Sequence, residues 1–250
     1  MKTSKFLLCS FVLLISLSFN FISAQDEVSQ REVIALLELK AKTKGHLWTH
    51  QWDQSQPIST WHGVTLRNGK VVGLDLSNNN LEGRIPITIG NLRYLEVLDL
   101  SGNSIEGKVP GLLRKFENLK VVNLADNALA GDIPTTIYKL QNLEELNLNN
   151  NKLEGELPKG ISELSNLKTL ALANNDLQGS MPEGMENLKK LKKLYLANNE
   201  FSDLNALRKL SEQQLVMSDF KIREGNLIAV DFTKSNESEG LSRLEFEDKE

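Results

Sequence analysis

The sequence predicts an α/β solenoid, a stack of short coils whose strands form one parallel β-sheet on a concave face. Two observations carry this prediction. A 24-residue pattern recurs six times without drift, and the flanking segments depart from it where a solenoid needs end caps. The composition agrees with a folded chain, because 40% of the 250 residues are apolar and 25% are charged. The formal net charge of -4 gives no indication of a nucleic-acid partner.

Each copy of the repeat contains a Leu-x-Leu pair, an asparagine, a glycine and a proline. The first leucine column contains Leu74, Leu98, Val122, Leu146, Leu170 and Leu194, and the second contains Leu76, Leu100, Leu124, Leu148, Leu172 and Leu196. The asparagine column contains Asn79, Asn103, Asn127, Asn151, Asn175 and Asn199. Alternation around each pair predicts a short strand with its leucines inward. The asparagine amide is expected to satisfy backbone groups that the turn would otherwise leave unpaired.

The repeated pattern L-x-x-L-x-L-x-x-N-x-L-x-G-x-[IVLM]-P resembles the leucine-rich repeat family, and its Leu-x-Gly-x-Ile-Pro ending resembles the plant-type class. The resemblance covers roughly residues 28 to 222. It implies a solenoid arc with a helical N-terminal cap, an irregular C-terminal cap and a concave sheet that binds a protein or peptide.

The first 24 residues have the composition of a secretory signal peptide. Lys2 and Lys5 precede an apolar run from Phe6 to Ile15, and Ala24 offers a small residue at the cleavage position. An uncleaved membrane anchor is the alternative, although several serines dilute this segment below a typical bilayer span. Cleavage after Ala24 would remove Cys9, the only cysteine, and leave a mature chain without disulfides or a membrane span. The expected location is secreted, periplasmic or extracellular.

The N-terminal cap is predicted over residues 25–70 as a helix followed by a hairpin. Apolar residues recur at helical spacing between residues 27 and 44, and Asn68-Gly69 is a typical two-residue hairpin turn. The segment Trp61-His62-Gly63-Val64 resembles the cap of plant-type leucine-rich repeat proteins. That cap usually carries two cysteines, in the pattern C-x-W-x-G-V-x-C, where this chain has Ser59 and Leu66. The difference leaves a plant origin and a bacterial or other microbial origin open.

The C-terminal end departs from the repeat. We expect six 24-residue repeats and one shorter repeat over residues 71–222, then a cap strand and an acidic tail over residues 223–250. Asp203 and Ala206 stand where glycine and proline are expected. A strand is predicted from Leu215 to Ile222, beginning only 21 residues after Leu194.

The predicted partner-binding surface is the outward side of the concave sheet. Its candidate contact residues, chosen by position between and beside the leucines, are Asp75, Asp99, Asn123, Glu145, Asn147, Asn149, Thr169, Lys193 and Tyr195. Acidic residues in the first two coils give way to Lys193 and Tyr195 in the sixth. This gradient would orient a charged partner.

Other clusters leave alternatives open. The three tryptophans, Trp48, Trp52 and Trp61, are expected either to pack the cap or to stack on sugars. Four lysines form either a solvated surface or a contact for an acidic protein or anionic glycan, and they are Lys189, Lys190, Lys192 and Lys193. His46 and His50 have i, i+4 spacing, but Gly45 ends the helix before them, so no metal site is expected.

The sequence thus predicts a secreted binding protein rather than an enzyme, with no cofactor and with a protein or peptide as ligand. Carboxylates on an open sheet lack the pocket that would adapt them to catalysis. A carbohydrate-binding or adhesion protein is the alternative. Analogy with secreted polygalacturonase-inhibiting proteins adds one more alternative function, inhibition of a polysaccharide-degrading enzyme. The ligand's identity and the oligomeric state stay open.

Overall fold

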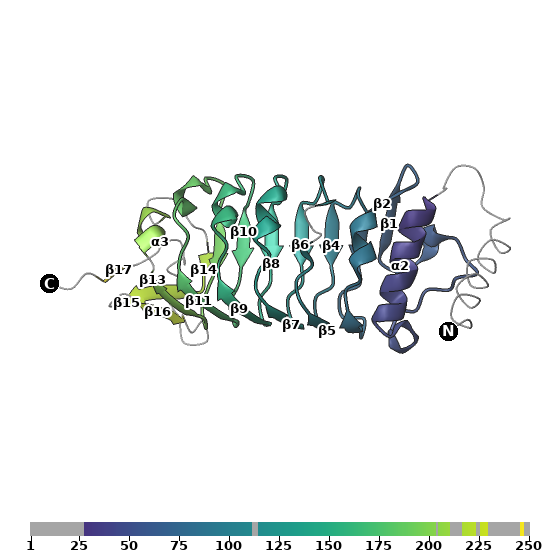
Figure 1. Cartoon of the computed structure of the whole chain (residues 1–250), viewed down its shortest axis with the longest axis horizontal. Helices are drawn as coiled ribbons and strands as arrows, with labels where there is room; N and C mark the ends of the chain where they lie inside the picture. Colours follow the sequence, from purple (N-terminus) through teal and green to yellow (C-terminus); the bar gives the residue numbers. More distant parts are fainter. Residues whose placement is uncertain are drawn as a thin grey trace, which may run out of the picture.

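The structure is a computed structural model that describes residues 28–111, 115–203, 205–210, 217–223, 226–229 and 246–247. The expected signal peptide lies outside these residues. Coils stack in one row from helix α2 (Gln30–Lys42) at the N-terminal end to helix α3 (Asn205–Leu210) near the C-terminal end (Figure 1). The predicted solenoid with a parallel sheet and a helical N-terminal cap is confirmed.

The larger sheet has eight strands, which neighbour each other in chain order. They are β1 (Val64–Arg67), β2 (Lys70–Asp75), β4 (Val97–Asp99), β6 (Val121–Asn123), β8 (Glu145–Asn147), β10 (Thr169–Ala171), β12 (Lys193–Tyr195) and β14 (Met217–Ser218). Strands β1 and β2 form the predicted antiparallel hairpin, and the later pairs are parallel. Leu74 lies opposite Leu98 and Leu146 lies opposite Leu170, so the sequence repeat is also the register of the sheet.

A second parallel sheet, which the sequence analysis did not predict, follows the asparagine turns. Its six strands are β3 (Glu82–Arg84), β5 (Ser104–Gly107), β7 (Ala128–Gly131), β9 (Lys152–Glu156), β11 (Asp176–Ser180) and β13 (Glu200–Asp203). In the part of the chain that the structure describes, 3-10 helices return the chain to the larger sheet, and they are η3 (Ile87–Asn91), η5 (Thr135–Lys139), η6 (Lys159–Glu163) and η7 (Met185–Asn187).

The core between these layers includes the two leucine columns, whose side chains are fully buried, and the apolar residues of the second sheet and the 3-10 helices that pack against them. The asparagines close the turns from inside, as expected. In the fourth coil, the Asn151 amide donates to the carbonyls of Leu124, Leu148 and Asn149 at 3.0–3.2 Å. Its oxygen accepts the Leu129 N–H at 3.0 Å. One side chain therefore joins two neighbouring coils and leaves no buried amide group unpaired.

The N-terminal cap is held by packing and hydrogen bonds. The stacked rings of Trp52 and Trp61 lie 4.8 Å apart, and Trp48 meets Trp52 edge-on at 4.9 Å. All three tryptophans are buried, and each indole N–H donates to a backbone carbonyl of the cap. The tryptophans are therefore part of the core, and their burial removes the surface that sugar stacking would need.

Short elements complete both ends of the solenoid. At the N-terminal end, η1 (Gly45–Leu47) and η2 (Ile58–Thr60) connect α2 to the hairpin. At the C-terminal end, β15 (Phe220–Arg223) lies between β16 (Asn226–Ala229) and β17 (Phe246–Glu247). Strand β14 pairs with β12 so that Leu194 lies opposite Ser218. The full 24-residue offset is thus kept between these two strands, in place of the 21-residue spacing expected, and the predicted strand start at Leu215 lies outside the described residues.

Candidate functional site

The candidate site is the concave face, defined as the outward side of β2, β4, β6, β8, β10 and β12. All nine predicted contact residues lie in these strands or, for Asn149, two residues after the end of one, and none of them is buried. Because adjacent parallel strands lie about 4.8 Å apart, residues 24 positions apart form straight columns across the face. The structure therefore brings the predicted residues together on one surface.

Four of these residues also have a structural role that the sequence analysis missed. In successive coils, the side-chain oxygens of Asp75, Asp99, Asn123 and Asn147 accept the backbone N–H two residues later, at 2.9–3.3 Å. This N–H group follows the strand, and an Asx-type hydrogen bond satisfies it within its own coil. One oxygen of each of these side chains is thus used in a hydrogen bond that stabilises the fold.

The last two coils satisfy the corresponding N–H groups differently, because Ala171 and Tyr195 occupy the acceptor column. In the fifth coil the Ala173 N–H donates to Asn149 of the preceding coil at 2.7 Å. In the sixth coil the Asp219 carboxylate accepts the N–H groups of Leu196 and Ala197. Asn149 and Asp219 therefore replace the missing acceptors from neighbouring coils.

Asp219 also affects Tyr195, the aromatic residue of the predicted site. Burial raises the pKa of the Asp219 carboxyl, although its hydrogen bonds from Leu196 and Ala197 oppose this change. Burial, and then the nearby Asp219 carboxylate, raises the pKa of the Tyr195 phenol. Tyr195 is therefore a neutral, half-buried ring at the end of the concave face.

One column of the face is free of such structural bonds. It contains Val97, Val121, Glu145, Thr169 and Lys193. Within the part of the chain that the structure describes, the side chains of Glu145, Thr169 and Lys193 form no hydrogen bond or ion pair. Val97 is 37% exposed, which is high for an apolar strand residue. Val97 and Val121 occupy the same column but are not among the predicted contact residues.

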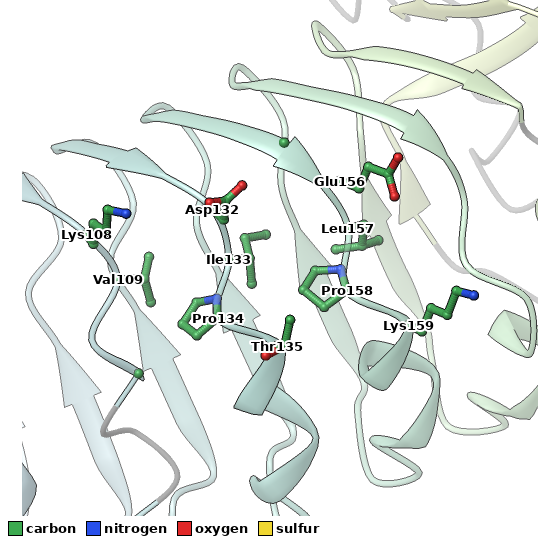
Figure 2. Close-up of a pocket in the computed structure, with 12 residues that line it drawn as sticks. Lys108, Val109, Asp132, Ile133, Pro134, Thr135, Glu156, Leu157, Pro158 and Lys159 are labelled. Carbon is green, nitrogen blue, oxygen red and sulfur yellow. The ribbon is translucent and has the colours of Figure 1, made fainter.

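A second feature of the molecule is a shallow trough between the second sheet and the returning 3-10 helices, with a volume of about 810 Å³ (Figure 2). Its apolar base contains Val109, Ile133 and Leu157, which are almost completely covered. Figure 2 shows Asp132 and Glu156 on the side of the sheet and Lys159 at the start of η6.

Glycine allows neighbouring coils to approach closely on this side of the sheet. Gly155 has a φ of +78°, and a Cβ atom there would lie 2.2 Å from the Asp132 carboxylate of the preceding coil. The Asp132 side chain therefore rests on the glycine of the next coil, in a backbone conformation that L residues rarely adopt. The trough is a surface depression formed by the repeat geometry.

The histidines of the cap do not gather as the i, i+4 spacing would place them. His46 lies in η1, whereas His50 stacks on His62 with ring centroids 4.3 Å apart. Among the described residues, no group of three histidine, cysteine, aspartate or glutamate side chains is arranged to hold a metal ion. No described helix is both long and apolar enough to cross a bilayer.

Comparison with known proteins agrees with this architecture. The family model for the leucine rich repeat matches residues 69–129, 117–177 and 141–201, which together form more than half of the chain. The chain therefore belongs to the leucine-rich repeat family, and its plant-type character is supported by its relatives.

The similar proteins include plant receptor kinases and a plant ice-binding protein. A probable leucine-rich repeat receptor-like protein kinase of Arabidopsis thaliana is 34% identical over 90 residues, which are 35% of this chain and only 9% of the kinase. The ectodomain of the Arabidopsis receptor kinase HAESA, solved with a peptide hormone ligand, is 29% identical with a TM-score of 0.66, covering 78% of this chain and 34% of the other. A plant ice-binding protein is 26% identical with a TM-score of 0.71, covering 78% and 64% of the two chains.

Proposed function

We propose that this chain is a secreted, non-catalytic binding module that recognises a protein or peptide through its concave face. The observation that carries the proposal is the column of Val97, Val121, Glu145, Thr169 and Lys193, because it presents varied side chains that the fold does not use. The similar HAESA ectodomain was solved with a peptide hormone, which supports a peptide-sized ligand. Secretion rests on the composition of residues 1–24.

Site-specific photo-crosslinking tests the proposal. A photoreactive benzoyl-phenylalanine at position 169 would report on the concave face, and the same residue in place of the exposed Glu154 would report on the second sheet. With extracellular proteins of the source organism, we expect one protein or peptide to crosslink at position 169 and not at position 154. Crosslinks at position 154 alone, or equal crosslinking at both positions, would contradict the proposal.

The carbohydrate and inhibitor alternatives now rest on fewer features. With the tryptophans buried, the four-lysine cluster is the remaining described feature that suits an anionic glycan. Inhibition of a polysaccharide-degrading enzyme is a special case of protein binding. The mass of the crosslinked partner at position 169 would identify such an enzyme directly.

A second candidate function, binding to ice, is favoured by the similarity to a plant ice-binding protein and by one regular surface. Asp126, Asn150, Asn174 and Asn198 are exposed once per coil, and each asparagine amide donates to the side chain of the preceding coil. This gives a straight row of polar groups with one spacing. Thermal hysteresis of the purified chain tests whether it binds ice. We expect Asn174→Lys to abolish the hysteresis. Absence of hysteresis, or equal hysteresis in the variant, would exclude this role for the row.

A further inference from the structure

A row of alternating charges runs along the beginning of the concave strands. The residues of this charge row, spaced by 24 positions, are Glu96, Lys120, Glu144, Lys168 and Lys192. Glu96 forms ion pairs with Arg67 of β1 and with Lys120, the latter at 3.0 Å. Glu144 forms an ion pair with Lys168 at 2.6 Å and lies in the field of Lys120. Each acid is thus shared between basic residues of both neighbouring coils.

These contacts affect the titration of both acids. Hydrogen bonds from Lys120 and then Arg67 lower the pKa of the Glu96 carboxyl. The hydrogen bond from Lys168 lowers the pKa of the Glu144 carboxyl. Near neutral pH, both carboxylates are therefore ionised and paired with basic side chains of the fold. They are not available as free anionic contacts for a ligand.

The alternation ends at the sixth coil. There Lys192 follows Lys168 directly, and Lys193 lies beside it at the start of β12. Within the described residues, neither lysine forms an ion pair or a side-chain hydrogen bond. Both are exposed. The row therefore ends in two adjacent positive charges at the position where its pattern would place a carboxylate.

Beside the charge row, the column of Val97, Val121, Glu145, Thr169 and Lys193 changes in side-chain type from coil to coil. From the second coil to the sixth it contains two valines, an acid, a hydroxyl and a base, and parallel pairing keeps these side chains aligned across β4, β6, β8, β10 and β12. Its apolar end is Val97 and its basic end is Lys193. The two ends of the column therefore differ chemically, so a ligand with unlike ends can bind in one preferred orientation.

We propose that this column binds an extended peptide that is acidic at one end, apolar at the other and basic between them. The inference rests on the proposed function and specifies its ligand. Strands lie about 4.8 Å apart and an extended peptide advances about 3.3 Å per residue. The four strand spacings from Val97 to Lys193 thus correspond to about six peptide residues. A basic side chain two or four residues from the acid would point to the same side of the peptide and lie nearest to Glu145. The acidic end would complete the charge row at Lys192 and Lys193.

A uronate polysaccharide fits this column less well. It carries like charges along its whole length, so a chain bound at Lys193 would bring carboxylates toward Glu145 and toward the exposed Val97. Like charges in contact and apolar surface against charge are both unfavourable. The mixed order of the column therefore favours a peptide.

The experiment uses a fluorescein-labelled octapeptide, amidated at its C-terminus, with valine at residues one and two, lysine at residue four, glutamate at residues seven and eight, and serine elsewhere. A peptide of reversed sequence covers the opposite chain direction, and a scrambled peptide with central glutamates keeps the composition. Fluorescence anisotropy with the full chain is expected to show binding of one of the two ordered peptides. We expect that peptide to bind at least fivefold more tightly than the scrambled one.

Matched variants assign the binding to the column. Lys193→Glu is expected to lower at least fivefold the affinity for the peptide that binds. Lys189→Glu is the same charge change four residues before the strand, and it should change this affinity less than twofold. A peptide with lysines in place of its two glutamates should then prefer the Lys193→Glu variant over the unmodified chain. Circular dichroism checks that each variant is folded.

Three results would overturn the inference. They are equal binding of the scrambled peptide, equal weakening by Lys189→Glu, and displacement of the peptide by trigalacturonate, which would assign the lysines to a glycan. If neither ordered peptide binds while position 169 still crosslinks to a partner, the proposed ligand chemistry is wrong and the concave-face function stands.

Discussion

Asn151 and Asn149 are two residues apart, but the fold uses their amides differently. Asn151 is buried and bonds to carbonyls of two coils, so its whole amide serves the turn. Asn149 is half-buried on the concave face, where its oxygen accepts the Ala173 N–H of the next coil. A single residue type therefore supplies both core hydrogen bonds and surface contacts, and burial decides which role each position has.

Removal of the Asn151 amide gives the first prediction. Asn151→Ala is expected to lower the free energy of unfolding by at least about 2 kcal/mol, because several buried backbone groups lose their partners. Urea denaturation followed by circular dichroism measures this. Lys152→Ala, at the exposed neighbouring position, should change the free energy by less than about 0.5 kcal/mol. Equal effects of the two substitutions would show that the amide is not essential to the turn.

The sequence was sufficient to predict which residues face outward, because strand alternation and the 24-residue spacing determine a side chain's direction. It was not sufficient to predict how free each side chain is. Whether Asp99 or Asn123 bonds to the backbone two residues later depends on backbone angles after the strand. That Glu145, Thr169 and Lys193, unlike Asp99 and Asn123, are free of such hydrogen bonds therefore appears only in three dimensions.

At the scale of elements, one buried carboxylate of helix α2 adds a hydrogen bond to the apolar packing that holds the helix on the solenoid. Ser29 and Glu32 form a capping box at the start of the helix, and the second carboxylate oxygen of Glu32 accepts the buried Val71 N–H at 3.1 Å. Glu32 itself is buried. This contact ties the cap to β2 without the disulfide that related caps usually carry.

Substitution of this carboxylate gives the second prediction. Glu32→Ala is expected to destabilise the chain by about 2–3 kcal/mol, since the Val71 N–H becomes unpaired and the capping box is lost. Thermal unfolding measures the effect. Glu38→Ala, in the same helix and without a side-chain hydrogen bond to a described residue, is the control. Equal melting temperatures for the two variants would show that Glu32 does not link the helix to the sheet.

The second sheet illustrates what the repeat pattern leaves open among the elements. Its strands β3 to β13 contain three to five residues each and include the glycine column, and glycine is unfavourable in strands. They form because each coil places the same segment beside that of the next coil. Stacking therefore overrides local propensity, and single-segment patterns do not reveal it.

Asp219 gives the third prediction, at the C-terminal end of the larger sheet. Burial raises the pKa of its carboxyl above the ordinary 3.8, so the folded state binds the proton more tightly than the unfolded chain. Stability from this group is complete below that ordinary value and is lost as pH rises through the raised pKa. Asp219→Asn keeps an oxygen acceptor for Leu196 and Ala197 and removes the buried charge.

We therefore expect Asp219→Asn to melt at a higher temperature than the unmodified chain at pH 7. The difference should shrink as pH falls toward 3.8. Differential scanning calorimetry between pH 3.5 and pH 7.5 measures both. A variant that is less stable than the unmodified chain at pH 7 would mean that the charge strengthens the hydrogen bonds from Leu196 and Ala197 by more than its burial costs.

For the whole molecule, the solenoid geometry makes each coil depend mainly on its neighbours. The core is continuous from Leu36 in α2 to Leu210 in α3, but each leucine packs within its own coil and the two beside it. The same geometry keeps the concave face regular. A defect in one coil is therefore expected to stay near that coil.

The fourth prediction tests this with Leu148, which is completely buried after β8. Leu148→Ala should cost about 2–5 kcal/mol, because it removes buried methyl groups and leaves a cavity between neighbouring coils. Leu47→Ala, the same change at a leucine that is 45% exposed in the cap, should cost less than about 0.5 kcal/mol. Hydrogen exchange adds the spatial part of the test. In Leu148→Ala, amides of β6, β8 and β10 should lose more protection than those of β2. Equal loss along the whole chain would mean that the solenoid opens as one cooperative unit, and the concave face could then not be altered coil by coil.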